Sequence, residues 1–138
     1  MTHGPKPPDV IVVGTNWLQR ALLRAQLIEA GYEIVAVDTW PIPRLYRRPE
    51  MKPLVLLIDL HQLPDPRETL DEVRYVMPPE RVLVVTALGS LTLEEVRARG
   101  FNVIERPVTI GQVVAATGKL LARARRERSA GASAPRQA

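Results

Sequence analysis

Three side chains that could take part in ionic chemistry follow short apolar runs of the chain: Asp59, Thr86 and Arg106. A carboxylate binds cations, a hydroxyl both donates and accepts hydrogen bonds, and a guanidinium grips a carboxylate through two parallel hydrogen bonds. We therefore expect Arg106 to be a permanent ionic partner of Asp59. The alternative for Arg106 is a solvated charge near a helix start, and for Thr86 it is a hydroxyl that satisfies a nearby backbone group.

Residue types and motifs that the chain lacks, or has few of, exclude several kinds of functional site. The chain has no cysteine, which excludes a disulfide framework, a thiolate metal site and a cysteine nucleophile. Its two histidines, His3 and His61, are too few for a histidine-based metal cluster. The chain contains neither a GxGxxG motif nor a P-loop, so a nucleotide-binding function has no support. We expect no cofactor apart from weakly bound Mg²⁺.

A sheet must position these side chains, because short apolar runs alternate with segments of helical period. The predicted strands are Val10–Val13, Ile34–Val37, Leu54–Ile58, Val82–Val85 and Asn102–Ile104. Near-continuous apolar strands are typical of a parallel sheet covered on both faces. We predict an α/β fold with a doubly wound five-stranded parallel sheet of order 2-1-3-4-5. A site in such a fold lies at the carboxyl ends of the strands, where the three side chains stand.

The helical segments alternate with these strands. They are Trp17–Ala30, Arg67–Val76, Thr92–Arg99 and a last helix from Thr109 to about Arg126. Asn16 is the predicted N-cap of the first helix, and Gly31 is its predicted C-terminal stop. The proline series from Pro41 to Pro53 leaves no room for a regular helix between the second and third strands. We therefore predict a degraded second helix, with at most one turn near Arg44.

The 138 residues have the length of one domain. We predict a flexible N-terminal arm over residues 1–8, a folded domain over residues 9–126 and a disordered basic tail over residues 127–138. No apolar run approaches the roughly 18 residues of a membrane span. The first residues also lack the apolar stretch of a signal peptide. We expect a soluble, cytoplasmic protein with no membrane partner.

The basic character of the chain belongs to its ends. From Asp9 to Gly118 there are 12 Lys and Arg against 14 Asp and Glu, and from Lys119 onward six bases against one acid. This basic end has no interleaved aromatic residues, which single-strand nucleic-acid sites use for stacking. Cations at a helix end that complement its dipole are the simpler explanation, so we do not expect a nucleic-acid partner.

Motifs in a fixed order carry a family resemblance across roughly Asp9 to Arg126. The stretch from Val12 to Tyr32, the run Leu57–Leu60, the pair Thr86-Ala87 and the pair Arg106-Pro107 match successive motifs of one family. In these features the chain resembles CheY-like receiver domains of response regulators. The resemblance implies that Asp59 is equivalent to the aspartate that receives a phosphoryl group, and that Thr86 is equivalent to the switch threonine.

The chain also departs from the family pattern in the residues that line this site. Gly14 and Thr15 stand where the family has an acidic pair that holds Mg²⁺, and Arg106 replaces a lysine. His61 stands where the family offers a backbone carbonyl to the metal. Asp59 is left as the remaining metal ligand, and one carboxylate makes a weak Mg²⁺ site.

The resemblance implies a stand-alone, atypical receiver domain, or pseudo-receiver, in two-component signal transduction. We expect a non-enzymatic protein with impaired phosphorylation that acts by protein–protein contacts with a sensor kinase or a downstream effector. It is expected to form a homodimer through the face from Thr92 to about Arg126. Two alternatives stay open. One is a working phosphoacceptor modified on Asp59 in a phosphorelay, and the other is a flavodoxin-like module that binds a small molecule near Gly14.

Overall fold

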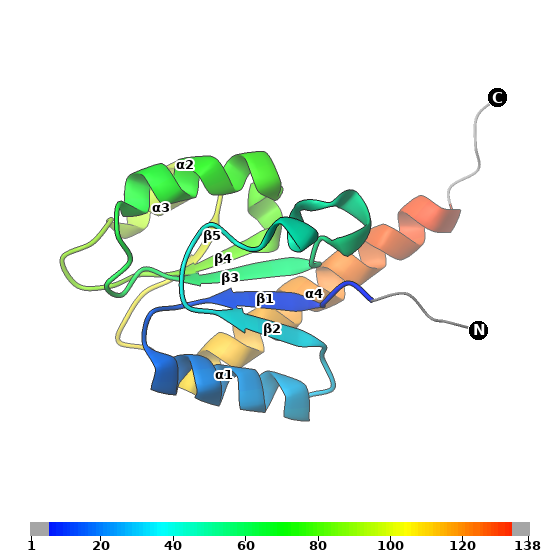
Figure 1. Ribbon diagram of the computed structural model, residues 1–138, viewed down its shortest axis with the longest axis horizontal. Coiled ribbons are helices and arrows are strands. Elements are labelled where there is room, and N and C mark those ends of the chain that lie inside the picture. The colour runs from blue at the N-terminus through cyan, green and yellow to red at the C-terminus, as the bar shows by residue number, and fades with distance from the viewer. Residues whose placement is uncertain (1–5, 134–138) are drawn as a thin grey trace.

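The computed structural model describes residues 6–133, which form a five-stranded, all-parallel sheet of order β2-β1-β3-β4-β5. The strands are β1 (Val10–Val13), β2 (Ile34–Val37), β3 (Val55–Asp59), β4 (Val82–Val85) and β5 (Asn102–Ile104). Figure 1 shows the sheet between helices on its two sides. The predicted fold class and strand order are both confirmed.

The apolar runs become strands because β-branched residues suit a pleated surface that is covered on both faces. Every residue of β1, β3 and β4 is buried, as expected of the three inner strands. The edge strands β2 and β5 are half-buried along their whole length. The buried inner strands hold their carboxyl ends, and therefore the candidate site, in fixed positions.

Within residues 6–133, four α-helices cover the two faces of the sheet. They are α1 (Trp17–Glu29), α2 (Pro66–Val76), α3 (Leu93–Ala98) and α4 (Ile110–Ser133). Leu27 of α1 and Leu121 of α4 belong to one core cluster, and Leu70 of α2 and Val96 of α3 belong to the other. Figure 1 shows the same division, with α2 and α3 on the opposite side of the sheet from α1 and α4.

The predicted helix boundaries are confirmed to within a few residues, except at the chain's last helix. The Asn16 side chain accepts hydrogen bonds from the backbone N–H groups of Leu18 and Gln19, as an N-cap does. Gly31 follows the helix with a φ of 98°, a conformation that glycine adopts without steric cost. A capping box joins Thr92 and Glu95 at the start of α3.

The segment between β2 and β3 is irregular, as its prolines predicted. It contains no α-helix, but it has two 3₁₀ turns, η1 (Arg44–Arg47) and η2 (Pro49–Met51), so the prediction of at most one turn is wrong. The second turn forms because Pro49 stands at its first position, where a proline is tolerated. A third 3₁₀ turn, η3 (Pro79–Arg81), precedes β4. Ile42 and Met51 are buried, so this segment contributes to the core although it lacks a regular helix.

The C-terminal prediction is wrong in part. Helix α4 continues to Ser133, so residues 127–133 are helical and do not belong to a disordered tail, and the predicted boundary at residue 126 is too early. The segment from Lys119 onward consists mainly of Leu, Ala, Arg and Glu, which favour helix strongly. Arg125 also lies 3.3 Å from the carboxylate of Asp9, which ties this part of α4 to the domain.

The structure describes only part of the predicted N-terminal arm and of the predicted C-terminal tail. Residues 1–5 and 134–138 lie outside the described residues, so those predictions stay untested there. Residues 6–8 have no regular secondary structure. None of the helices between residues 6 and 133 is long and apolar enough to cross a membrane.

Candidate functional site

The candidate site lies where β1, β3 and β4 end side by side. Asp59 is the last residue of β3 and pairs in register with Val85 of β4. Its side chain is nearly enclosed, because only 6% of the residue is exposed. Thr86 follows β4 directly and is also buried. A carboxylate in this position loses most of its contact with water and needs a cation or several hydrogen bonds.

Arg106 supplies that cation from the loop after β5. Its Nη1 donates to Oδ1 of Asp59 at 2.6 Å, and its Nη2 donates to Oδ2 at 2.6 Å. Each terminal nitrogen therefore holds a different carboxylate oxygen, in the paired geometry that a planar guanidinium favours. The predicted ion pair between Arg106 and Asp59 is confirmed.

Neighbouring groups hold the guanidinium in place. Nη1 of Arg106 also donates to the backbone oxygen of Thr86, and Nη2 donates to Oε1 of Gln19, both at 2.9 Å. The hydrogen bonds to Asp59 raise the pKa of Arg106 above its ordinary value, although burial acts in the opposite direction. The guanidinium thus stays charged and bonded to four oxygens from three residues.

Thr86 has the alternative role that the sequence predicts for it, since its hydroxyl satisfies a nearby backbone group. Its hydroxyl oxygen accepts a hydrogen bond from the backbone N–H of Arg106 at 3.3 Å. Together with the bond from Nη1 to the Thr86 backbone oxygen, this contact fastens the loop after β5 to the end of β4. The hydroxyl thus satisfies a backbone donor next to the ion pair.

Gly14 and Thr15 bring no charge to the site and make backbone-directed contacts. The Thr15 hydroxyl donates to the backbone oxygen of His61 at 2.7 Å. The backbone oxygen of Gly14 accepts a hydrogen bond from Nη1 of Arg20 at 2.6 Å. The backbone N–H of His61 donates to Oδ1 of Asp59 at 2.9 Å, so this oxygen accepts two hydrogen bonds.

These residues do not fit a Mg²⁺ ion. Such an ion needs one or more free carboxylates in a near-octahedral shell of oxygens. Both oxygens of Asp59 are bound to Arg106, and the carbonyl of His61 is bound to Thr15. Asp38 and Glu105 follow the two edge strands, β2 and β5, and are exposed. Within residues 6–133, no group of three or more His, Cys, Asp or Glu side chains could hold a metal ion.

Sequence reasoning missed two residues of the site, Gln19 and Arg20. Both stand in the first turn of α1, where long side chains point back toward the N-terminal end of the helix. They therefore reach the loop after β1 and the guanidinium of Arg106. Their place three and four residues after the predicted N-cap, Asn16, is the signal that could have identified them.

The space around the ion pair is small. A hollow of about 40 Å³ lies beside Asp59, Arg106 and Gln19, far below the roughly 300 Å³ at which ligand pockets begin. A wider, open hollow of about 750 Å³ lies on the outer side of Arg106, along the loop that leads into α3. Asp59 does not line this second hollow, because Arg106 stands in front of it.

Comparison with known proteins points to one group. No protein-family model matches the chain. The chemotaxis protein CheY of Thermotoga maritima is 24% identical over 115 residues, which cover 80% of this chain and 95% of that protein. This similarity therefore spans nearly the whole length of the relative.

Solved structures agree with this relative. A signal receiver domain from Vibrio parahaemolyticus has a TM-score of 0.71 and 25% identity, over 88% of this chain and 95% of that one. A CheY-like response-regulator receiver domain from Methanospirillum hungatei has a TM-score of 0.69 and 21% identity, over 90% and 99% of the two chains. The chain is therefore similar in sequence to CheY over most of its length, and its five-stranded parallel sheet has the fold of CheY-like response-regulator receiver domains.

Proposed function

We propose that this chain is an atypical receiver domain of two-component signalling in which Arg106 permanently neutralises Asp59. The bidentate hydrogen bonds between the two side chains are the observation that supports this proposal. The domain then signals through protein–protein contacts in one fixed state, with impaired phosphorylation, and performs no catalysis of its own. We place it in the cytoplasm, with a sensor kinase or a downstream effector as its partner.

Impaired phosphorylation follows from the chemistry of the acceptor. Phosphoryl transfer needs a carboxylate oxygen free to attack in line and a cation that neutralises the charge on the transferred group. Both oxygens of Asp59 accept hydrogen bonds from Arg106. Phosphorylation would have to displace the guanidinium and leave Asp59 without it. Gly14 and Thr15 carry no carboxylate, so these two positions cannot recruit a metal ion in place of Arg106.

The fixed state follows from the elements that the hydrogen bonds of Arg106 connect. Arg106 connects the end of β3, the end of β4 and the first turn of α1 through Asp59, Thr86 and Gln19. In a working receiver these loops would have to rearrange when the acceptor changes its charge. Here a permanent cation holds them together, so the output depends on the presence of a partner and not on modification of Asp59.

Three further sequence expectations stay proposals. A phosphorelay function through Asp59 would require Arg106 to move away from the carboxylate. A small molecule near Gly14 would need more space than the 40 Å³ hollow beside the ion pair offers. A homodimer through the face of α3, β5 and α4 would have to accommodate the exposed charges of Arg97, Lys119 and Arg123 on that face.

Intact-mass spectrometry after incubation with an acyl phosphate donor and Mg²⁺ tests the proposal. We expect no phosphorylated species for the natural chain. The matched variant carries Gly14→Asp, Thr15→Asp and Arg106→Lys, which restore the acidic pair and the lysine of the family. A Cβ on Gly14 would lie 3.6 Å from Cβ of Asp59, an ordinary contact, so the first substitution fits. Stoichiometric phosphorylation of the natural chain that Asp59→Asn abolishes would refute the proposal.

A further inference from the structure

Helix α1 exposes an apolar stripe on the side that faces away from the sheet. Within residues 6–133, four of the seven exposed large apolar side chains lie on this helix: Trp17, Leu18, Leu22 and Ile28. Ala21 and Ala25 stand between them and are exposed as well. Figure 1 shows α1 at the side of the molecule, and β2 and α4 contact it from the inside. An apolar patch of this kind is typical of an interaction surface.

The inner face of α1 packs on the domain without using this stripe. Leu23 and Leu27 are buried in the core cluster that α1 shares with α4. Gln19 also turns inward, where it accepts a hydrogen bond from Arg106. The helix is therefore apolar on two opposite faces, whereas a helix on the surface of a monomer needs only one apolar face. This pattern indicates that another molecule covers the outer face.

The stripe has the spacing of a short two-stranded coiled coil. Its central residues follow one another at intervals of three, four and three, which is the alternation of a and d positions in a heptad repeat: Leu18, Ala21, Ala25 and Ile28. The two alanines in the middle allow the backbones of two helices to approach closely. A second helix of the same spacing therefore fits along the stripe.

We propose that a second copy of this chain covers the stripe, in a symmetric pair of two parallel α1 helices. Trp17 and Arg24 stand at the g positions of the heptad, and Leu22 and Glu29 stand at the e positions. In a parallel pair each g residue faces the following e residue of the other helix. Trp17 then packs on Leu22 of the second copy, and Arg24 meets Glu29. Because the interface is symmetric, each of these contacts forms twice.

The charges beside the stripe are free to make these contacts. Arg24 and Glu29 are both exposed. The salt bridges within residues 6–133 involve neither of them. A parallel pair thus places opposite charges next to each other and no like charges at the flanking positions. This charge complementarity selects the parallel orientation of a second copy.

The stripe is also large enough for the core of an interface. Its four large side chains are between 42% and 70% exposed. They offer roughly 400 Å² of apolar surface, in the range of the largest patch on a typical monomer. Since a protein interface is only about 57% apolar, such a stripe fits an interface of about 700 Å² per copy, close to the standard size of about 800 Å².

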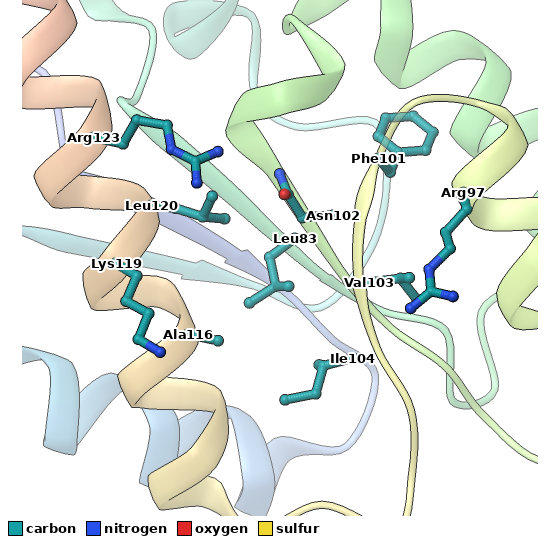
Figure 2. A pocket seen from close by; sticks show the side chains of 10 residues that line it. All are labelled: Leu83, Arg97, Phe101, Asn102, Val103, Ile104, Ala116, Lys119, Leu120 and Arg123. Atoms are coloured by element: carbon teal, nitrogen blue, oxygen red, sulfur yellow. The ribbon is translucent and has the colours of Figure 1, made fainter.

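The face of α3, β5 and α4, on which the sequence predicts a homodimer, suits a symmetric pair less well. Figure 2 shows Lys119 and Arg123 of α4 on one side of β5 and Arg97 of α3 on the other. A two-fold axis through this face would bring these bases close to their own copies. The ten side chains that line the hollow there include no acid that would compensate. The outer face of α1 avoids this repulsion.

The pair of α1 helices goes beyond the proposed function and is independent of it. Asp59 and Arg106 do not belong to the stripe, and Gln19 reaches Arg106 from the opposite face of α1. A monomeric protein would therefore leave the proposal about Asp59 intact, and phosphorylation of Asp59 would leave the stripe intact.

Sedimentation equilibrium of the full chain, from micromolar to hundreds of micromolar, tests the pair. We expect a monomer–dimer equilibrium within this range. Arg24→Glu and Glu29→Arg each place like charges opposite one another at two symmetric positions, so each should raise the Kd of the dimer at least about tenfold. The double variant Arg24→Glu/Glu29→Arg restores opposite charges and should dimerise like the natural chain. Circular dichroism checks that every variant folds.

The matched control for this charge swap is Lys119→Glu/Arg123→Glu, which changes two charges on α4 away from the stripe and should leave the Kd unchanged. A monomer throughout the concentration range would overturn the inference, because the stripe would then belong to a different protein. A dimer that the control variant abolishes would overturn it too, since the pairing would then use the face of α3, β5 and α4. So would a dimer that neither single variant weakens.

Single cysteines test the parallel orientation, because the natural chain has none. Ala21→Cys and Ile28→Cys stand two turns apart, about 10 Å along the helix axis. In a parallel pair each faces its own copy, so both variants should form an intermolecular disulfide under mild oxidation. Gln26→Cys, outside the stripe, is the matched control and should stay unlinked. Cross-linking of only one of the two stripe variants, or equal cross-linking of the control, would overturn the parallel pair.

Discussion

The ion pair at the end of β3 should be a large, measurable contributor to stability. Changing Arg106→Met removes the charge but keeps most of the apolar stem, and leaves the Asp59 carboxylate without its cation. The Asp59 side chain is 9% exposed and that of Arg106 is 26% exposed. Exposed pairs contribute about 0–1 kcal/mol, and removing one partner of a buried pair costs about 3–5 kcal/mol. For a partly buried fork we expect Arg106→Met to lower the free energy of unfolding by about 2–4 kcal/mol.

A double-mutant cycle separates the pair from the effects of each residue alone. Urea unfolding of the natural chain, Arg106→Met, Asp59→Asn and the double variant gives the coupling free energy. We expect about 2 kcal/mol, because each charge-assisted bond contributes about 1.5–3 kcal/mol and solvent reduces the sum. The exposed pair between Arg81 and Glu127, 3.6 Å apart, is the matched control and should couple by less than about 0.5 kcal/mol. Equal coupling in the two cycles would refute the view that Arg106 fixes Asp59.

Two further predictions concern the helices that frame the site. Hydrogen bonds from Arg67 and Thr92 lower the pKa of Glu95 from 4.5 to about 2, so its stabilising contribution should be complete above pH 4.5 and disappear as the pH falls toward 2. NMR titration of the Glu95 carboxyl measures this directly, and Glu95→Gln should remove that part of the pH dependence of unfolding. Leu121 is fully buried against the sheet, so Leu121→Ala should cost about 2–5 kcal/mol, whereas Leu18→Ala on the exposed face of α1 should cost less than about 1 kcal/mol in the same urea assay. Similar losses for the two leucine variants would contradict the assigned packing.

The fold was predictable because its signals are local and agree with one another. The continuous apolar runs, the N-cap at Asn16 and the stop at Gly31 each define an element boundary within the chain itself. The prolines from Pro41 to Pro53 exclude a helix by covalent geometry, which tertiary contacts do not override. Helix α4 was predicted too short because the end of the chain, rich in Ala, Ser, Gly, Pro and Arg, was interpreted as disorder, although its Ala, Arg and Glu residues favour helix.

The contact between Asp59 and Arg106 could be predicted from the sequence, whereas the contacts of the residues around this pair could not. Arg106 and Asp59 both follow strands of a parallel sheet, and opposite charges at one sheet edge attract, so their contact could be expected. The hydrogen bonds from Thr15 to His61, from Arg20 to Gly14 and from Arg106 to Gln19 depend on side-chain rotamers in the loop after β1 and the first turn of α1. A sequence pattern fixes the positions of such residues but not the direction in which each side chain points.

Titration with Mg²⁺ tests the central claim most directly, because the ion and Arg106 compete for the same carboxylate. NMR spectra that resolve the Asp59 carboxyl carbon and the Arg106 guanidinium nitrogens would be followed as Mg²⁺ is added. We expect no saturable change of either signal below the millimolar range, since Asp59 is held at 2.6 Å by both nitrogens and no second carboxylate assists. Saturation at tens of micromolar Mg²⁺, with release of the Arg106 signal, would contradict the account.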